Sequence, residues 1–514
     1  MNIPQGTDRK QRLSKSDYLA GLQCPKHLWL RVNEPEAAEL EVDQNLEALF
    51  EQGRRVGELA RTYVPGGTLI DFPYYAVDDK LTATKRALDE GREVIYEAAF
   101  AADDQFVTID ILERTPEGFV VTEVKSSTKV KNEHVQELAL QADILRECGI
   151  PVLRFFVMHI NRECVYPNLE NLFVRKDVTE QVTELQTKVA EARKSQKETL
   201  ASSLPVVQIG PQCLAPSECP FKDRCWADVP EHHVTTISGI RAKKAFELVE
   251  AGFTTITELP VDFRLSSTAE RQRRAVVEER LIVEPTLDAA LEAFPSSLGF
   301  LDFETVGLAI PVWDGCRPYD AVPVQFSFCR LQPDGTLMHS EWLADGPDDP
   351  REPLALALIE SCRNVETIIA YNASFEARAL THLAEARPNL ANELESIKAR
   401  LVDLLPMVRD HVYDPEFNGK FGLKQVLPAL LGVTPYENLE ISDGDTASWS
   451  LRSLMFERDK FTPDEISRMR NSLEEYCSAD TESLARLLSV LRSLGSSSAE
   501  TSDSITQSLD TVIV

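Results

Sequence analysis

The stretch that most constrains the fold of this chain runs from residue 106 to residue 127, FVTIDILERTPEGFVVTEVKSS. Apolar residues recur on both sides of a Pro-Glu-Gly turn, and this pattern predicts a β-hairpin. Asp110 lies in the first predicted strand, and Glu123 and Lys125 lie in the second. Because side chains alternate between the two faces of a strand, Glu123 and Lys125 share a face, and the hairpin can bring Asp110 beside them.

Two carboxylates that face one lysine can bind a divalent cation, orient a water and neutralise a phosphate. An ordinary ion pair on a surface strand is the alternative interpretation. The Asp…Glu-Val-Lys pattern resembles the PD-(D/E)XK nuclease superfamily, and within it the RecB-like branch. The resemblance implies that Asp110 and Glu123 bind Mg²⁺ or Mn²⁺ and that Lys125 acts beside them in phosphodiester hydrolysis.

An amphipathic helix is predicted from Asn132 to Cys148, because apolar residues recur there at helical spacing and a glycine follows. RecB-like nucleases carry a Gln-x-x-x-Tyr motif on the helix that follows the Glu-x-Lys strand. Gln141 matches the glutamine of that motif, which implies a role in the active site. Leu145 stands where the tyrosine would be. This departure affects the expected aromatic contact to the substrate and leaves the metal site unchanged.

Three cysteines recur at intervals of six in the segment PQCLAPSECPFKDRCW: Cys213, Cys219 and Cys225. Their density, among prolines that exclude a long helix, indicates metal ligation with a fourth ligand elsewhere in the chain. Some RecB-like nucleases bind a 4Fe-4S cluster through one cysteine before the nuclease core and three after it. By that resemblance Cys24 is the fourth ligand. A structural zinc site and buried cysteines without a ligand are the alternatives.

A second group of acidic residues begins at residue 298, where strand-like segments follow one another: LGFLDFET, VPVQFSFCRL and TLMHSEWLA. Asp302 and Glu304 are two residues apart on the first strand and therefore share a face. A fourth strand, ETIIAY, leads into a helix that carries Glu376. Tyr476 and Asp480 share a face of a later helix, because they are four residues apart.

The succession Asp-Phe-Glu, Asn-x-x-Phe-Glu and Tyr-x-x-x-Asp resembles the DnaQ-like exonucleases. These enzymes have an RNase H-like fold and belong to the Asp-Glu-Asp-Asp class. The resemblance implies that Asp302, Glu304 and Asp480 bind two Mg²⁺ or Mn²⁺ ions. It also implies that Tyr476 positions the attacking water.

The fourth metal ligand is the one departure from that pattern. The family has aspartate where this chain has Glu376, whose side chain is one methylene longer but keeps the charge and can still bind Mg²⁺. Asp403, in the strand-like segment RLVDLLPMV, is the competing candidate. A helix cap at Glu376 and a surface position for Asp403 are the alternatives without a metal. Lys424, at the start of another helix, is expected to line the path of a nucleic-acid strand.

The chain has 514 residues and is expected to form more than one domain. We predict an α/β protein with a restriction-endonuclease-like (PD-(D/E)XK) core and iron–sulfur cluster over residues 14–230. An RNase H-like, mixed-sheet exonuclease domain is predicted over residues 288–494. Residues 231–287 are expected to form a helical connector, which either resembles a helix-hairpin-helix element that presents amides to phosphates or is an ordinary linker. Residues 1–13 and 495–514 are expected to be disordered tails.

The net charge is −29, from 54 basic and 83 acidic residues, which argues against a protein that coats nucleic acid irrespective of sequence. Local basic clusters remain, each either a solvated face or part of a channel for a strand: residues 125–131, 241–244 and 271–274. No apolar run approaches the ~18 residues of a membrane span. Ten irregularly spaced cysteines indicate a reducing compartment, so a cytoplasmic protein without a membrane partner is expected.

Together these patterns predict a metal-dependent nuclease that hydrolyses phosphodiester bonds, with a RecB-like site and a DnaQ-like 3′-exonuclease site. The expected partner is nucleic acid, DNA in preference to RNA, and the expected cofactors are a 4Fe-4S cluster and Mg²⁺ or Mn²⁺. Two alternatives stay open. One is a nucleic-acid-binding or regulatory protein whose nuclease folds no longer cut, and the other is an exonuclease that processes RNA.

Overall fold

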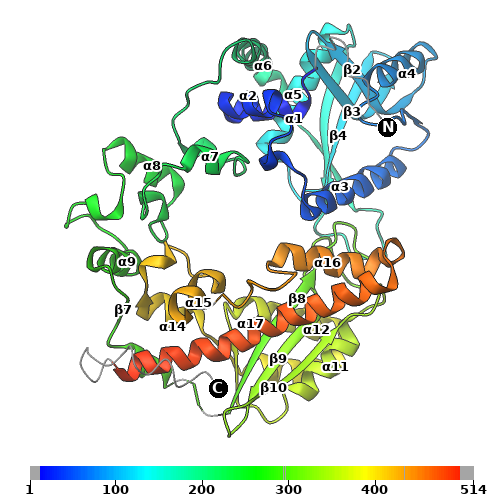
Figure 1. Cartoon of the computed structure of the whole chain (residues 1–514). Coiled ribbons are helices and arrows are strands. Elements are labelled where there is room, and N and C mark those ends of the chain that lie inside the picture. Colours follow the sequence, from blue (N-terminus) through cyan, green and yellow to red (C-terminus); the bar gives the residue numbers. More distant parts are fainter. Residues whose placement is uncertain (1–11, 293, 296, 433, 498–514) are drawn as a thin grey trace. The chain divides into compact units, whose positions relative to one another are not determined.

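The computed structural model describes residues 12–292, 294–295, 297–432 and 434–497, and the chain divides into two compact units (Figure 1). The first unit holds the residues up to Asp228 together with the segment Leu308–Tyr319, and the second unit holds the remainder. Each unit has helices packed on a mixed sheet, which confirms the predicted α/β class. No helix in the described part of the chain is long and apolar enough to cross a membrane.

The first unit is built on a six-stranded sheet in the order β1-β2-β3-β4-β5-β6. Its strands are β1 (Thr68–Leu69), β2 (Val94–Ala102), β3 (Gln105–Thr115), β4 (Gly118–Lys125), β5 (Val152–Ile160) and β6 (Phe173–Asp177). β3 and β4 form the predicted hairpin, with Thr115 paired to Gly118. β4 and β5 run parallel, because α5 (Asn132–Glu147) connects them as a crossover.

Helices of the first unit enclose its core against the sheet. The helices are α1 (Lys15–Gln23), α2 (Pro25–Asn33), α3 (Gln44–Tyr63), α4 (Val77–Asp89), α5, α6 (Thr179–Leu200) and α7 (Lys222–Trp226). α5 packs on α6 and on β3 and β5, and its apolar face is buried as its spacing predicted. Leu145, which stands in place of the tyrosine of RecB-like nucleases, is fully buried in this core. It is therefore a packing residue.

The first unit also includes a short segment that lies, in the chain, between two strands of the second unit. Leu308–Tyr319 lies between β8 (Leu298–Val306) and β9 (Val322–Leu331) in the chain but belongs to the first unit. Ala309, which is buried, packs with Val56 of α3. The hydroxyl of Tyr319 donates a hydrogen bond to the carbonyl of Ser126, the residue after Lys125. The predicted boundaries of 14–230 and 288–494 miss this element, because it enters the first unit from another part of the sequence.

The second unit is built on a five-stranded sheet in the order β10-β9-β8-β11-β12. β8, the central strand, runs antiparallel to β9 and parallel to β11. The remaining strands of the unit are β7 (Ile282–Val283), β10 (Leu337–Leu343), β11 (Thr367–Ala370), β12 (Leu401–Asp403) and β13 (Val412–Tyr413). The long helix α17 (Pro463–Ser497) packs across β8, β9 and β10 (Figure 1). The other helices of the second unit are α8 (Ala242–Glu250), α9 (Ser267–Glu278), α10 (Leu287–Leu291), α11 (Arg351–Ser361), α12 (Ser374–Ala386), α13 (Ala391–Lys398), α14 (Leu405–His411), α15 (Leu423–Leu431) and α16 (Gly444–Phe456).

The region expected to be a separate connector, residues 231–287, belongs to the second unit. β7 pairs with β13, and Arg271 on α9 binds Glu284 with 2.9 Å between Nε and Oε1. Arg271 also donates to the carbonyl of Arg409, 2.9 Å away. These bonds fix the region to the rest of the unit. They also remove Arg271, which is buried, from the basic cluster expected to face solvent or a strand.

Both predicted disordered tails include residues that the structure describes as part of the fold. Leu13 is buried, and its amide donates to the carbonyl of Asp104, 2.7 Å away, so this residue is fixed beside β3. At the other end α17 continues through Gly495 to Ser497. The rest of the two predicted tails, residues 1–11 and 498–514, lies outside the described residues.

Candidate active sites

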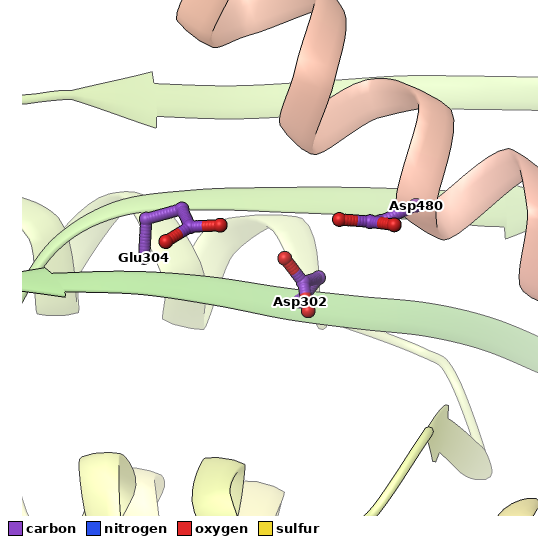
Figure 2. A group of neighbouring side chains, drawn as sticks. All are labelled: Asp302, Glu304 and Asp480. Carbon is purple, nitrogen blue, oxygen red and sulfur yellow. The ribbon is translucent and has the colours of Figure 1, made fainter. Parts of the chain in front are cut away.

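The central strand of the second sheet carries the first two residues of an acidic cluster. Leu301 and Phe303 of β8 are buried in the core, so Asp302 and Glu304 point to the opposite face. Asp480, on α17, meets them there: one carboxylate oxygen from each of the three residues lies within 4.8 Å of the others. Figure 2 shows the three side chains, two from one strand and one from the helix beside it. The structure thus brings together three acidic residues that are up to 178 positions apart in the chain.

Burial disfavours the ionised forms of these three carboxylates, and repulsion by neighbouring carboxylates adds to this effect at Asp302 and Glu304. Burial, followed by the charges of Asp480 and Glu304, raises the pKa of Asp302 well above its ordinary value. Burial and Asp480 raise the pKa of Glu304 to about 8, and burial raises the pKa of Asp480 to about 6. A divalent cation at this position would reverse the effect, because it favours the ionised carboxylates.

Glu376, on α12, is the stronger candidate for a fourth acidic ligand. Its side chain is buried, its Oε2 atom has no hydrogen-bond partner among the described residues, and burial raises its pKa to about 8. It lies outside the group of three, but its charge contributes to the raised pKa of Asp302. Asp403 is already engaged, because its Oδ1 accepts hydrogen bonds from the amides of Asn372 (2.9 Å) and Leu405 (3.0 Å).

A cavity opens beside the acidic cluster, and its wall includes Asp302, Asp480, Tyr476, Tyr436 and Lys424. The Tyr436 hydroxyl donates a hydrogen bond to Oδ1 of Asp480. The ammonium of Lys424 lies 5.6 Å from the centre of the Tyr436 ring and 5.9 Å from that of Tyr476. Lys424 lines this cavity, and its place along a nucleic-acid strand stays a prediction. Tyr436 belongs to none of the recognised patterns, and no local signal in the sequence points to it.

In the first unit, the structure brings the four expected site residues together. Glu123 is buried, and its Oε1 lies 3.0 Å from the ammonium of Lys125. Gln141, on α5, donates to Oε2 of Glu123 over 2.6 Å. Asp110, on β3, accepts a hydrogen bond of 2.6 Å from the backbone amide of Val124.

Two further charged residues enter this site. Lys15, the first residue of α1, lies 2.9 Å and 3.1 Å from the two carboxylate oxygens of Glu123. Glu137 accepts a hydrogen bond of 2.6 Å from Lys125. Glu137 precedes Gln141 by four residues, so helical spacing alone could have identified it. Lys15 is 108 positions from Glu123, and no local pattern connects the two.

The two carboxylates of the predicted metal site differ in their electrostatic surroundings. Burial and the charge of Glu123 raise the pKa of Asp110 to about 8. Burial also opposes ionisation of Glu123, but the ammonium groups of Lys125 and Lys15 outweigh it and hold the pKa of Glu123 well below its ordinary value. Glu123 is therefore held in its ionised, paired form, whereas burial and Glu123 disfavour the ionised form of Asp110.

The four cysteines expected to bind a cluster line one small cavity of the first unit. Cys24 separates α1 from α2, Cys213 and Cys219 lie in the loop after α6, and Cys225 lies on α7. Burial, with the other three thiols contributing, raises the pKa of Cys219 to about 11. The side chain of Gln23 ties α1 to this loop, because it donates to the carbonyls of Gln212 and Ser217, each 2.8 Å away. Four cysteines from both ends of the first unit therefore line one cavity.

Part of the chain matches a known protein family. Residues 299–422, less than half of the chain, match the model of a family described as a domain of unknown function, DUF2779. The matched part includes Asp302, Glu304 and Glu376 and ends before Asp480. No curated protein matches the chain.

The raised pKa values predict how the metal-free second unit depends on pH. The stability contributed by the neutral carboxyl forms is fully present below their ordinary pKa of about 4. It is lost as the pH rises through about 6 and about 8. Calorimetry in EDTA should therefore show a falling melting temperature for this unit between pH 5 and pH 8.5, and Mn²⁺ should restore stability mainly at the high end.

Asp302→Asn is the control for this experiment, because it removes one of the repelling charges. The variant should melt at a higher temperature than the parent at pH 8.5 in EDTA and gain less from Mn²⁺. A melting temperature that depends on neither pH nor Mn²⁺ would contradict the account of the acidic cluster.

Proposed function

We propose that this chain is a metal-dependent nuclease with one hydrolytic centre in each unit, acting on DNA in preference to RNA. The observation that carries the proposal is the acidic cluster of the second unit. Its three carboxylates converge within 4.8 Å at a cost in electrostatic repulsion, and a fourth buried carboxylate nearby has an unpartnered oxygen. Oxygen ligands of this kind suit Mg²⁺ and Mn²⁺, and perturbed pKa values concentrate at functional sites.

In the second unit, Asp302, Glu304 and Asp480 would hold the metal ions, and Glu376 would complete the set. Bound there, the ions supply a water of lowered pKa and stabilise charge on the leaving 3′ oxygen. Tyr436 fixes the orientation of Asp480 through its hydrogen bond. This arrangement, with its Tyr-x-x-x-Asp helix laid across the central strand, supports assignment of the unit to the RNase H-like, DnaQ-like exonucleases.

The cavity beside the cluster is suited to the end of a nucleic-acid strand. Lys424 brings a positive charge to a wall that otherwise carries carboxylates, so it would neutralise a backbone phosphate. The ring of Tyr476 lies on the same wall, where its hydroxyl can orient the attacking water. These two residues act on the substrate, and the acidic residues act on the metal.

In the first unit, Asp110 and Glu123 would hold one divalent cation, and the ionised, hydrogen-bonded state of Glu123 prepares it for that role. Gln141 orients the carboxylate of Glu123. Lys125 is held by Glu137 next to the same carboxylate, from where it would neutralise the scissile phosphate. The hairpin with this constellation, followed by α5, supports assignment of the unit to the restriction-endonuclease-like fold and its RecB-like branch.

The cysteine cavity is proposed to hold a 4Fe-4S cluster through Cys24, Cys213, Cys219 and Cys225. A cluster at this place would tie α1 to the loop that follows α6, so it would close the first unit across a long stretch of sequence. Its role would be structural, since a ligand bound only in the folded state stabilises that state.

One observation favours a second function, strand binding without cutting. Lys15 and Lys125 already face Glu123 and Glu137, so two positive charges meet two carboxylates at this site without a metal. Such a site could hold a phosphate backbone and leave it intact. Activity measurements decide between the two functions, and parallel DNA and RNA substrates decide between those two polymers.

The two-centre proposal predicts two separable activities. Lys125→Ala should lower cutting by the first unit by about 10²-fold or more, because a charged group at the reacting phosphate is lost. Asp302→Ala should remove 3′-end trimming by the second unit and leave the other activity unchanged. End-labelled single- and double-stranded DNA and RNA, incubated with Mg²⁺ or Mn²⁺, give both readouts.

Lys188→Ala is the matched control, because Lys188 is an exposed lysine of the same unit, on α6, outside the basic clusters. It should cut like the parent. If one single change removes all activity, the chain has one centre. If the parent binds strands and never cuts them, the strand-binding function is correct.

Protein purified without oxygen should contain about four iron atoms per chain, as a 4Fe-4S cluster requires. Cys24→Ser should lose the iron and lower the stability of the first unit. Cys148→Ser should keep the iron, because Cys148 is exposed at the end of α5, away from the cysteine cavity. Elemental analysis that finds one zinc and no iron would contradict the assignment.

A further inference from the structure

Lys15 is built into the acidic site of the first unit, although none of the recognised nuclease patterns includes it. Its ammonium lies between both carboxylate oxygens of Glu123, at 2.9 Å and 3.1 Å, and 3.9 Å from Glu137. Its side chain is only 20% exposed. This is a second lysine on the carboxylate that Lys125 also contacts.

The backbone around Lys15 is fixed from both sides. Leu13 lies against β3, where the amide of Phe106 donates to its carbonyl over 2.9 Å. Ser14 and Asp17 form a capping box, in which each accepts a hydrogen bond from the backbone amide of the other. Asp17 also binds Arg31 of α2 at 2.7 Å. These bonds fix the start of α1 and hold the backbone of Lys15 beside Glu123. The pair therefore differs from a surface ion pair whose lysine is not fixed by its surroundings.

Lys15 and a divalent cation would compete for the carboxylate oxygens of Glu123. Both oxygens of Glu123 contact Lys15, and one of them also accepts from Gln141, so a cation bound between Asp110 and Glu123 must take an oxygen from the lysine. The displaced ammonium still has Glu137, 3.9 Å away, as a neighbouring acceptor. A lysine head is a compact charge on a flexible stem, so it can move to a neighbouring acceptor.

We propose that Lys15 is a phosphate-binding residue of this site: it occupies Glu123 in the absence of metal and moves to a non-bridging phosphate oxygen of the nucleic-acid strand once the cation takes Glu123. The inference rests on the proposed nuclease function of the first unit. It identifies the ligand of Lys15 as a backbone phosphate held by the same cation. Lys15 and Lys125 then bind the scissile phosphate from two different elements, α1 and β4.

The test compares Lys15→Met with Lys188→Met, a change at an exposed lysine of α6 outside the basic clusters. Both variants are made in full-length protein that carries Asp302→Ala to silence the second unit. Mn²⁺ binding to the first unit is measured by titration calorimetry, and cutting is measured in single turnovers at saturating Mn²⁺. Lys15→Met should bind Mn²⁺ roughly tenfold tighter or more, because a competing positive charge is gone. It should also cut about 10²-fold more slowly, because a charge at the phosphate is gone. Lys188→Met should match the parent in both measurements.

The outcomes separate this inference from the function on which it rests. If Lys15→Met binds Mn²⁺ and cuts like the parent, Lys15 is only a member of an ion pair. If the variant loses Mn²⁺ binding together with cutting, Lys15 holds the carboxylates in place and contacts no phosphate. Lys15→Gln keeps a hydrogen-bond donor to Glu123 and serves for the same comparison if Lys15→Met does not fold. A parent that neither binds Mn²⁺ nor cuts would overturn the nuclease function of the first unit, and this inference with it.

Discussion

Buried negative charge is the constraint on which both candidate sites of this structure depend, because it has to be compensated. Two sheets each present carboxylates at a place where water is scarce, and an ionised carboxylate there is costly unless a positive charge accompanies it. In the first unit the accompanying charges are two lysines on Glu123. In the second unit three converging carboxylates have Lys424 at a cavity wall and raised pKa values that record the repulsion. A divalent cation would compensate the charge of these three carboxylates more completely than Lys424 does.

The two groups of carboxylates therefore differ in how their charge is compensated. The first is paired with its own lysines, so binding of a metal there would exchange one cation for another. The second would gain charge compensation if a cation bound, so metal binding and stability would be coupled there. This difference explains why one site depends on the placement of α1, which carries Lys15, whereas the other depends on α17, which carries Asp480.

Local periodicity was enough to predict the elements that carry the sites. The hairpin around Glu123, the helix of Gln141 and the strand of Asp302 and Glu304 all lie where the sequence placed them. Residues that reach a site from a distant part of the chain could not be found this way: Lys15 and Tyr436 have no spacing relation to the residues they contact. The same holds for Leu308–Tyr319, whose place in the first unit follows from packing and not from order in the chain.

The central claim is that both groups of carboxylates are metal sites. Crystals of the full chain grown with Mn²⁺ and a non-cleavable strand, measured at the manganese absorption edge, test it most directly. The account predicts anomalous density between Asp302, Glu304 and Asp480, and separate density between Asp110 and Glu123 with Lys15 displaced from that carboxylate. Full manganese occupancy elsewhere in the chain, with neither group of carboxylates bound, would contradict it.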